Sequence, residues 1–301
     1  MSLTSHSTLA VPGSVANLGG GFDTLAVAVQ VYLRLKILEV RDDGGARLTV
    51  VNSSPPVRGR NAVERAFEAM VRWTGREAPS VFAEVESDIP MAAGLGSSAA
   101  AAVAGLRAFE RVTAPVPEGV LLAVATSLEG HADNAAAALH GGLTSVIETE
   151  GQEPRALRWA WPDELRLIVA TPSTGLATAK ARAALADAIP RRDAVFNLQR
   201  VLSLMHALQS GEYGRLREAV QDRWHQPARA SLIPQLTAVL ALEDPEMLGS
   251  FLSGAGPSVA VLARRDCARL EQLLKSTYER AGVAATVRTL DVHQPSEVFA
   301  L

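Results

Sequence analysis

Residues 90–100 read PMAAGLGSSAA, and this glycine-rich stretch decides how the fold is interpreted. A strand-like pattern ends near Asp88, and an alanine-rich segment that favours helix begins at Ser97. Gly94 and Gly96 allow the backbone to approach a ligand closely or to take positive φ values. The free N–H groups of the new helix point into the loop beside the positive end of the helix dipole. The stretch is therefore a candidate phosphate-binding site.

Two other phosphate-binding loops have similar sequences but do not fit this stretch. It is not a Walker P-loop, because Gly-Lys-Ser/Thr does not occur in it. Gly94, Gly96 and Ala99 have the G-x-G-x-x-A spacing of a Rossmann loop, but residues 115–119 downstream lie between two helix patterns rather than at the end of a strand. An ordinary helix start capped by one of the serines stays open on the residues alone.

Composition limits the class of protein. The chain has 301 residues, 48% hydrophobic and 20% charged, with a formal net charge of −3, so no basic excess favours nucleic acid. The single Cys267 cannot close an intrachain disulfide, and the N-terminus lacks a signal-like apolar run. The uncharged stretch 89–106 is interrupted by proline, glycine and serine, unlike a membrane helix. We expect a cytoplasmic protein that does not bind a membrane.

Strand-like and helix-like patterns alternate without a regular βαβ rhythm, which favours an α+β fold over a doubly wound sheet. Strands are expected at 31–40, 48–51, 81–85, 143–147, 165–170, 258–262 and 284–292. Helices are expected at 61–73, 97–109, 120–128, 134–139, 177–186, 194–209, 232–242 and 267–280. The polar stretch 148–155 is the best boundary candidate, which predicts two lobes, 1–150 and 151–301.

Two further segments share the small, charge-poor character of residues 90–100: residues 12–23 (PGSVANLGGGFD) and 253–258 (SGAGPS). Together, in this order, the three segments resemble the GHMP kinases, whose phosphate loop follows the pattern P-x-x-x-G-L-G-S-S-A-A. Further stretches are similar to the homoserine kinase branch of that family: EGHADN at 129–134, GGL at 141–143, DAVFNL at 193–198 and PARASLI at 227–233. The resemblance spans nearly the whole chain.

The resemblance implies a two-lobed GHMP kinase fold and an activity. The N-terminal, ATP-binding lobe would resemble ribosomal protein S5 domain 2, and the C-terminal lobe would be ferredoxin-like. The activity would be direct in-line phosphorylation of the side-chain hydroxyl of homoserine by ATP, in threonine biosynthesis. Homoserine and ATP are thus the expected partners, and the sequence leaves open whether the chain forms a homodimer.

The resemblance also implies where the nucleotide binds. Ser98 and Glu129 are expected near Mg²⁺, which neutralises charge on the phosphate oxygens. The expected ATP-binding residues are Asn61, Pro90, Met91, Ala92, Ala93, Gly94, Leu95, Gly96, Ser97, Ser98, Ala99 and Ala100.

For the acceptor, a zwitterionic amino acid needs an anion for its ammonium group and arginine for its carboxylate. By motif match, Asp23 is expected to bind the ammonium group, and Arg182 and Arg229 the carboxylate. Asn17 and His131 are expected at the hydroxyl end.

The sequence suggests no strong base for the chemical step. Some family members pair an aspartate with an N-terminal lysine, whereas this chain has no lysine before Lys36, and Asn134 falls where that aspartate would be. We expect positioning and electrostatics to carry the reaction, with Asn134 and Thr178 as candidate catalytic residues and Thr178 as a relay to the hydroxyl. A mevalonate-type kinase and a non-catalytic ligand sensor of the same fold are the alternatives.

Overall fold

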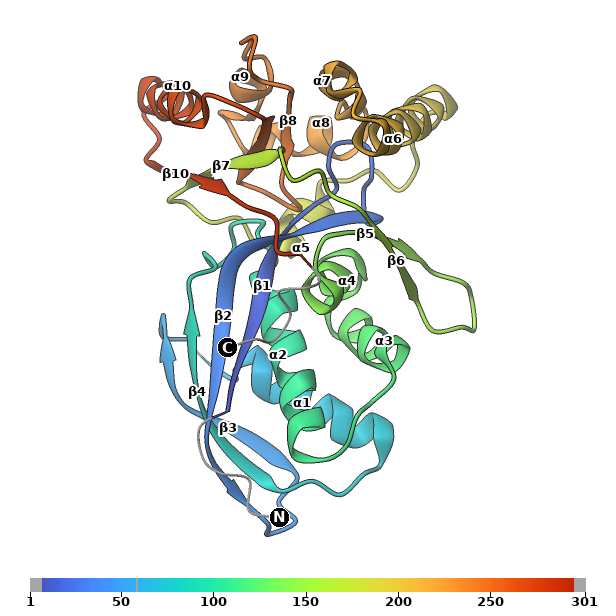
Figure 1. Cartoon of the computed structure of the whole chain (residues 1–301), viewed down its shortest axis with the longest axis vertical. Coiled ribbons are helices and arrows are strands. Elements are labelled where there is room, and N and C mark those ends of the chain that lie inside the picture. Colours follow the sequence, from blue (N-terminus) through green and yellow to red (C-terminus); the bar gives the residue numbers. More distant parts are fainter. Residues whose placement is uncertain (1–6, 58, 295–301) are drawn as a thin grey trace.

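The computed structural model describes residues 7–57 and 59–294, and it divides them between two sheets (Figure 1). The first sheet has six strands in the order β3-β4-β2-β5-β6, with β1 paired to β2, and the second has four in the order β10-β7-β9-β8. Parallel and antiparallel pairs mix in the first sheet, and every pair in the second is antiparallel. The predicted α+β class and the two-lobed fold are confirmed.

The first sheet is built on one long strand. Its members are β1 (Thr8–Ala16), β2 (Leu25–Arg41), β3 (Arg47–Ser54), β4 (Ser80–Ser87), β5 (Leu143–Ile147) and β6 (Arg155–Trp159). Strand β2 begins six residues earlier than the alternation at 31–40 predicts, because its first residues are buried on both faces. The sequence does not predict β1, since Pro12 and Gly13 discourage a strand; both sit at a break in the β1–β2 register, where such residues are tolerated.

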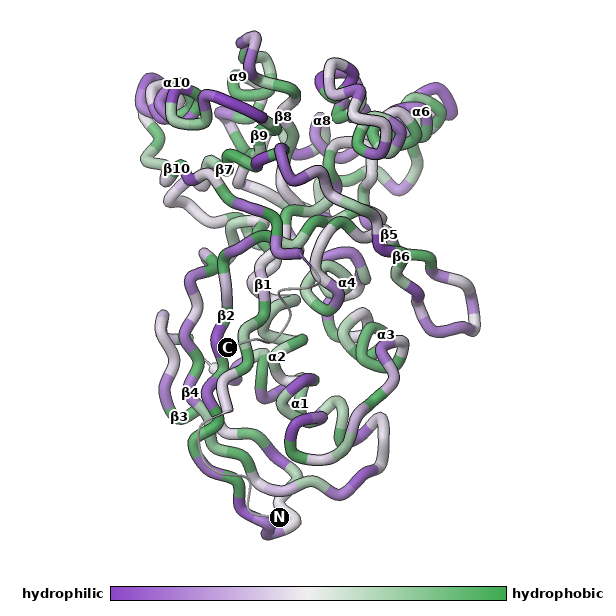
Figure 2. The backbone as a smooth tube through the Cα atoms, viewed as in Figure 1, coloured by the Kyte–Doolittle hydropathy of each residue, from purple (hydrophilic) through white to green (hydrophobic). Residues whose placement is uncertain are grey.

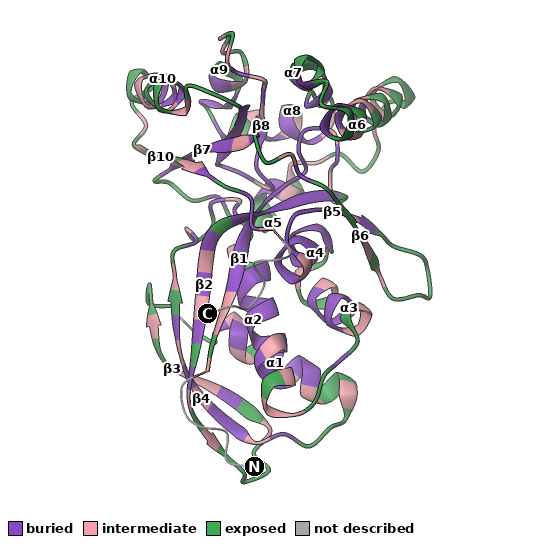
Figure 3. Cartoon of the chain, viewed as in Figure 1, coloured by how far each residue is buried: buried purple, intermediate pink, exposed green. Residues whose placement is uncertain are grey.

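Four helices cover one face of this sheet (Figure 1): α1 (Ala62–Thr74), α2 (Ser97–Val112), α3 (Glu118–Glu129) and α4 (Asp133–His140). Asn61 caps α1, because its Oδ1 accepts from the Val63 N–H at 3.0 Å while Glu64 accepts from the Asn61 N–H at 3.2 Å. Helix α2 is largely buried (Figure 3), which explains its alanine-rich composition. A Cβ on Gly105 would lie 2.2 Å from the Val63 carbonyl oxygen, so this glycine lets α1 and α2 approach closely.

The second lobe carries helices on a smaller antiparallel sheet. Its strands are β7 (Arg166–Pro172), β8 (Gly249–Leu252), β9 (Val259–Ala263) and β10 (Ala285–Leu290). Its helices are α5 (Thr178–Ala183), α6 (Arg191–Ser210), η1 (Tyr213–Arg215), α7 (Leu216–Ala219), α8 (His225–Arg229), η2 (Ala230–Leu232), α9 (Leu236–Leu240) and α10 (Cys267–Arg280). The helix expected at 232–242 is shorter in the structure, where α9 begins only at Leu236. Pro234 has no backbone N–H to donate, so it interrupts a helix that starts at residue 232.

Hydropathy follows this layering. Figure 2 shows hydrophobic residues along α2 and hydrophilic residues on the outer helix α10. Among the described residues, no helix is both long enough and apolar enough to cross a bilayer.

The chain passes between the lobes twice. Strand β6 pairs with β5 and so belongs to the first sheet by hydrogen bonding, although it follows the boundary that the sequence suggests at residue 150. After β10 the chain returns to the first lobe, where the His293 N–H donates to the Ala28 carbonyl at 3.0 Å and its carbonyl accepts from the Gly142 N–H at 2.7 Å. The division at residue 150 stays a prediction, and the two crossings tie the lobes together.

The three glycine-rich segments meet where the lobes touch. The Ser253 hydroxyl donates to the Gly94 carbonyl at 2.6 Å, and the Gly254 N–H donates to the Ala16 carbonyl at 3.1 Å. Gly94 has φ +79°, and a Cβ on it would lie 2.3 Å from the Ser253 carbonyl oxygen. Only glycine therefore fits there without moving the segments apart.

The contact between α1 and α2 gives a test of the fold. We expect Gly105→Ala to lower the free energy of unfolding by about 1–3 kcal/mol, because overpacking outweighs the higher helix propensity of alanine. The matched control is Gly214→Ala, since a Cβ on Gly214 meets no atom within 4 Å. Urea denaturation of both variants measures the effect, and equal stabilities would contradict the described packing.

Candidate active site

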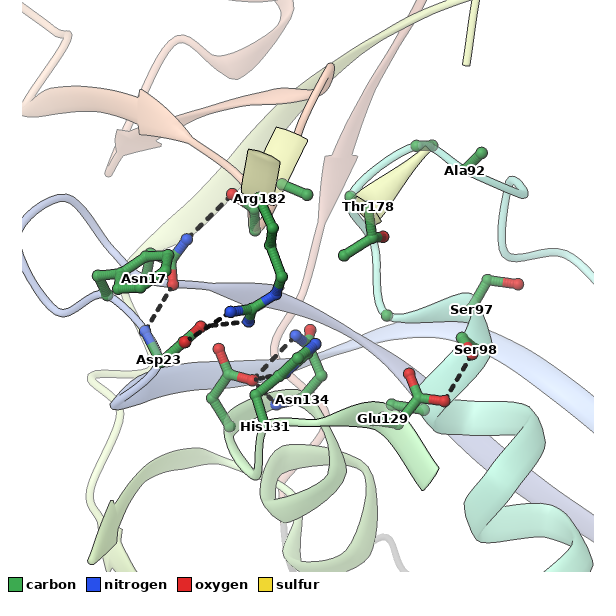
Figure 4. A pocket seen from close by; sticks show the side chains of 18 of the residues that line it. Asn17, Asp23, Ala92, Ser97, Ser98, Glu129, His131, Asn134, Thr178 and Arg182 are labelled. Carbon is green, nitrogen blue, oxygen red and sulfur yellow. Dashed lines mark hydrogen bonds and ion pairs between the residues drawn. The ribbon is translucent and has the colours of Figure 1, made fainter. Parts of the chain in front are cut away.

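A cavity of about 280 Å³ lies between the lobes, at the meeting point of the glycine-rich segments (Figure 4). It is lined by Asn17, Phe22, Asp23, Ala92, Ala93, Gly94, Gly96, Ser97, Ser98, Ala99, Glu129, His131, Asp133, Asn134, Thr178, Arg182, Arg229, Gly254 and Ala255. The list includes all the residues expected to bind the acceptor or the metal, and both candidate catalytic residues.

Five residues expected at the ATP site do not line this cavity. Leu95 and Ala100 are buried, whereas Pro90 and Met91 line a separate groove beside β2 and β10. Asn61 is also buried, and its side-chain oxygen is engaged in capping α1. An approach of Asn61 to the adenine stays a prediction.

The phosphate-loop end of the cavity is built from backbone. Gly96 precedes α2 in the left-handed region with φ +69°, no side chain caps the helix, and its first turn carries no acidic residue. The first-turn N–H groups are thus available to an anion, and the helix dipole favours negative charge there. A Cβ on Gly96 would lie 2.2 Å from Ser14 Oγ, so a larger residue would close the loop.

Ser98 and Glu129 face each other at the same end of the cavity (Figure 4). The Ser98 hydroxyl donates to Glu129 Oε1 at 2.6 Å, which joins the start of α2 to the last residue of α3. A hydroxyl and a carboxylate oxygen at this spacing are hard donors of the type that Mg²⁺ prefers. This donor set fits a divalent cation beside a bound phosphate.

The opposite end of the cavity holds an ion pair between the lobes. Arg182 of α5 donates to both oxygens of Asp23, at 2.9 Å and 2.7 Å (Figure 4). Asp23 itself has φ +52°, and its N–H donates to Asn17 Oδ1 at 3.1 Å. The Asn17 amide in turn donates to the Gly254 carbonyl at 3.0 Å, so Asn17 fixes the conformation that presents Asp23.

Arg229 lies beneath this pair and is 1% exposed. Its guanidinium donates to the carbonyl oxygens of Ala181 at 3.2 Å and Gly254 at 3.0 Å. Burial, reinforced by the nearby positive charge of Arg182, lowers the pKa of Arg229 to about 10. The group therefore stays cationic at neutral pH, and two arginine cations face one end of the cavity.

Asp133 also lines the cavity, although no role was expected for it from the sequence. It is buried, and its Oδ1 accepts from the Asn134 N–H at 2.7 Å and bonds to His131 Nδ1 at 2.6 Å. Burial lowers the pKa of His131, but the hydrogen bond and the charge of Asp133 outweigh it, so the pKa lies above its ordinary value. One carboxylate oxygen each of Asp23 and Asp133 and one ring nitrogen of His131 lie within 4.8 Å of one another. A signal existed in the sequence, since Asp133 stands between two assigned residues of the EGHADN stretch.

The candidate catalytic residues differ in their surroundings. Asn134 Oδ1 accepts from the Ser14 hydroxyl at 2.8 Å, and its Nδ2 donates to Asp133 at 3.2 Å, so both ends of the amide are engaged. Thr178 begins α5 one turn before Arg182, and Figure 4 places it between the Arg182 end and the Ser97–Ser98 end of the cavity. A neutral amide is a weak proton acceptor, so the site offers no aspartate base at position 134.

Comparisons with known proteins agree with this arrangement. Residues 61–142 match the GHMP kinases N terminal domain, and residues 204–280 match the GHMP kinases C terminal domain. Homoserine kinase of Nostoc sp. strain PCC 7120 is 34% identical over 97% of this chain and 99% of that protein. Homoserine kinase of Gloeobacter violaceus is 39% identical over 90% of this chain and 92% of that protein.

Solved structures show the same fold. The crystal structure of homoserine kinase from Cytophaga hutchinsonii is similar with a TM-score of 0.85 and 26% identity, covering 98% of this chain and 97% of that one. Mevalonate kinase of Methanococcus jannaschii is similar in fold alone, with a TM-score of 0.68 and 14% identity over 97% of this chain and 100% of that one. From its sequence matches and from the shared two-lobed fold, the chain belongs to the GHMP kinase family.

Proposed function

We propose that the chain transfers the γ-phosphoryl group of ATP to the side-chain hydroxyl of L-homoserine, giving O-phospho-L-homoserine for threonine biosynthesis. One observation carries the proposal: a single cavity has charges for a zwitterion at one end and an uncapped helix N-terminus at the other. The curated relatives named homoserine kinase, similar over nearly the whole chain, support the same acceptor. The single Cys267 suits a reducing cytoplasm.

The charges at the acceptor end are complementary to an amino acid. Asp23 and the buried Asp133 supply two carboxylates for the ammonium group, and Arg182 and Arg229 supply two guanidinium groups for the carboxylate. In the structure Asp23 and Arg182 form an ion pair with each other. A zwitterion inserted between them would provide each with a new partner of the correct sign, so neither charge is left unpaired.

At the donor end, the residues 94–98 would hold the triphosphate through backbone N–H groups. Ser98 and Glu129 would hold Mg²⁺, which supplies charge neutralisation on the phosphate oxygens when bound. The remaining residues expected at the ATP site, Asn61 among them, would shape the nucleotide pocket.

In the chemical step, the acceptor oxygen bonds to the γ-phosphorus as the bond from that phosphorus to ADP breaks, and the hydroxyl proton leaves. We propose that His131 and Asn17 hold the hydroxyl end, and that Thr178 relays the proton from the acceptor hydroxyl to an oxygen of the transferred phosphoryl group. Asn134 contributes through its amide dipole, so positioning and electrostatics replace a strong base.

A substrate comparison tests the proposed acceptor. With Mg-ATP, we expect ADP release to depend on homoserine and to be absent with mevalonate, which lacks the ammonium group that Asp23 and Asp133 would bind. A coupled ADP-release assay measures both. Turnover of mevalonate alone would overturn the proposed acceptor, and tight binding of Mg-ATP without ADP release from any acceptor would indicate a sensor.

The two arginines test the carboxylate site. Arg182→Ala and Arg229→Ala should each raise the KM for homoserine about 10- to 100-fold, since a hydrogen bond to a charged group is worth about 1.5–3 kcal/mol. The KM for ATP should change little. Arg192→Ala is the control, because the Arg192 side chain is 83% exposed and lies outside the cavity. An equal effect on both substrates would contradict the assignment.

The roles of Thr178 and Asn134 have a separate test. We expect Thr178→Val and Asn134→Ala to lower kcat more than they change either KM, because both side chains are assigned to the step that transfers phosphate. Steady-state kinetics at saturating ATP separates the two parameters. If both variants lose activity through KM alone, neither residue has the proposed catalytic role.

A further inference from the structure

Arg229 contacts a buried histidine, His225, which lies outside the sequence motifs that resemble the family. His225 begins α8, one turn before Arg229, and it is completely buried. Its Nδ1 lies 3.1 Å from Nη1 of Arg229, and its Nε2 lies 2.8 Å from the Gly19 carbonyl oxygen. The imidazole therefore lies between a guanidinium group that faces the cavity and the segment 17–23 that carries Asp23.

The two partners of His225 determine where its proton is. A carbonyl oxygen can only accept, so Nε2 carries the hydrogen and donates it to Gly19. A guanidinium group can only donate, so Nδ1 must present its lone pair to Arg229. Burial lowers the pKa of His225, opposed in part by Asp222, whose Oδ2 lies 3.8 Å from Nε2. The ring is thus a neutral Nε2–H tautomer.

Aromatic packing also joins the segment 17–23 to His225 and Arg229. The Phe22 ring packs against Trp224, with 4.7 Å between centroids, and against His225 at 5.5 Å. The guanidinium carbons of Arg182 and Arg229 lie 5.6 Å and 5.4 Å from the Phe22 centroid. One ring therefore lies near both cations, and the segment 17–23 is fixed relative to them.

Backbone geometry leaves little room for this segment to move. Gly19 has φ +83°, and a Cβ on it would lie 2.1 Å from the Val220 carbonyl oxygen. Its own carbonyl oxygen lies 2.8 Å from Nε2 of His225. The imidazole is thus one of two links between Arg229 and the segment that carries Asp23; the other is the Gly254 carbonyl, which accepts from both Asn17 and Arg229.

We propose that His225 is a positioning residue that couples Arg229 to the segment carrying Asp23 and thereby sets the preference for acceptors with a carboxylate. The proposal rests on the proposed function. His225 does not touch the acceptor; it holds the guanidinium group by accepting from it and holds the segment by donating to it.

Two substitutions separate the functions of the ring nitrogens. In His225→Asn, the side-chain oxygen takes the place of Nδ1 and can still accept from Arg229. In His225→Gln, the terminal amide takes the place of Nε2 and can still donate to Gly19, but Arg229 loses its side-chain acceptor and keeps only the Ala181 and Gly254 carbonyl oxygens. We expect the KM for homoserine to rise about 10-fold in His225→Gln and less than about 3-fold in His225→Asn, with the KM for ATP unchanged.

An acceptor without a carboxylate shows whether the effect passes through Arg229. For 3-amino-1-propanol, which keeps the hydroxyl and the amine, kcat/KM should be the same in His225→Gln and the wild type. Equal losses in the two variants with homoserine, or equal losses on both acceptors in His225→Gln, would overturn the proposal. If the wild-type protein does not phosphorylate homoserine, the proposed function fails instead.

A measurement on the wild-type protein does not depend on how the variants fold. Long-range nitrogen–proton NMR spectra distinguish the two neutral tautomers and the protonated form of each histidine, and the signals of His225 are assigned by their loss in His225→Asn or by sequential assignment. We expect the Nε2–H tautomer at neutral pH. A protonated ring or an Nδ1–H tautomer would overturn the proposal, because neither can accept from Arg229.

Discussion

The ion pair between Asp23 and Arg182 is the interaction on which the active site depends. It joins a segment of the first lobe to α5 of the second, with both side chains about one-third exposed, at 32% and 34%. A pair at this exposure contributes little to stability, because water screens it. Its importance lies in the proposed function, in which the ammonium and carboxylate groups of the acceptor would take the place of this pair, with Asp23 and Arg182 each bound to a group of opposite charge.

Close backbone contacts keep that pair beside the phosphate loop. Gly94 contacts Ser253, and Gly254 accepts from both Asn17 and Arg229 through its carbonyl. These bonds connect the three glycine-rich segments, so the proposed acceptor and donor sites share one framework. Gly94 is required there both for its φ of +79° and for space, since a Cβ on it would lie 2.3 Å from the Ser253 carbonyl oxygen.

Local patterns in the sequence predicted most of the fold. The alanine-rich helix after Ser97 and the helix that was expected at 61–73 follow from propensity and periodicity, which act within a few residues. Strands β1, β6 and β8 were missed for different reasons: β1 contains Pro12 and Gly13, β6 is almost entirely exposed and so shows no buried face, and β8 is only four residues long. Each pairs with a strand nearby in the sequence, but alternation of apolar and polar residues is the signal for a half-buried strand, and these three do not show it.

Only the site residues that match motifs of the family could be predicted from the sequence. Asp23, Arg182 and Arg229 were placed by resemblance, and the structure brings them into one cavity with the phosphate loop. The hydrogen bonds of Asp133 are local, to His131 and Asn134, whereas the role proposed for His225 comes from a tertiary contact. His225 bonds to a carbonyl 206 positions away, so its tautomer and its link to Arg229 are visible only once the lobes are assembled.

A crystal structure with homoserine and a non-hydrolysable ATP analogue would show whether the acceptor binds between these charges. We expect the ammonium group to lie within hydrogen-bond distance of Asp23, the carboxylate to contact Arg182 and Arg229, and the hydroxyl to point toward the γ-phosphate. Homoserine bound elsewhere, or bound in this cavity with its carboxylate away from both arginines, would contradict this arrangement.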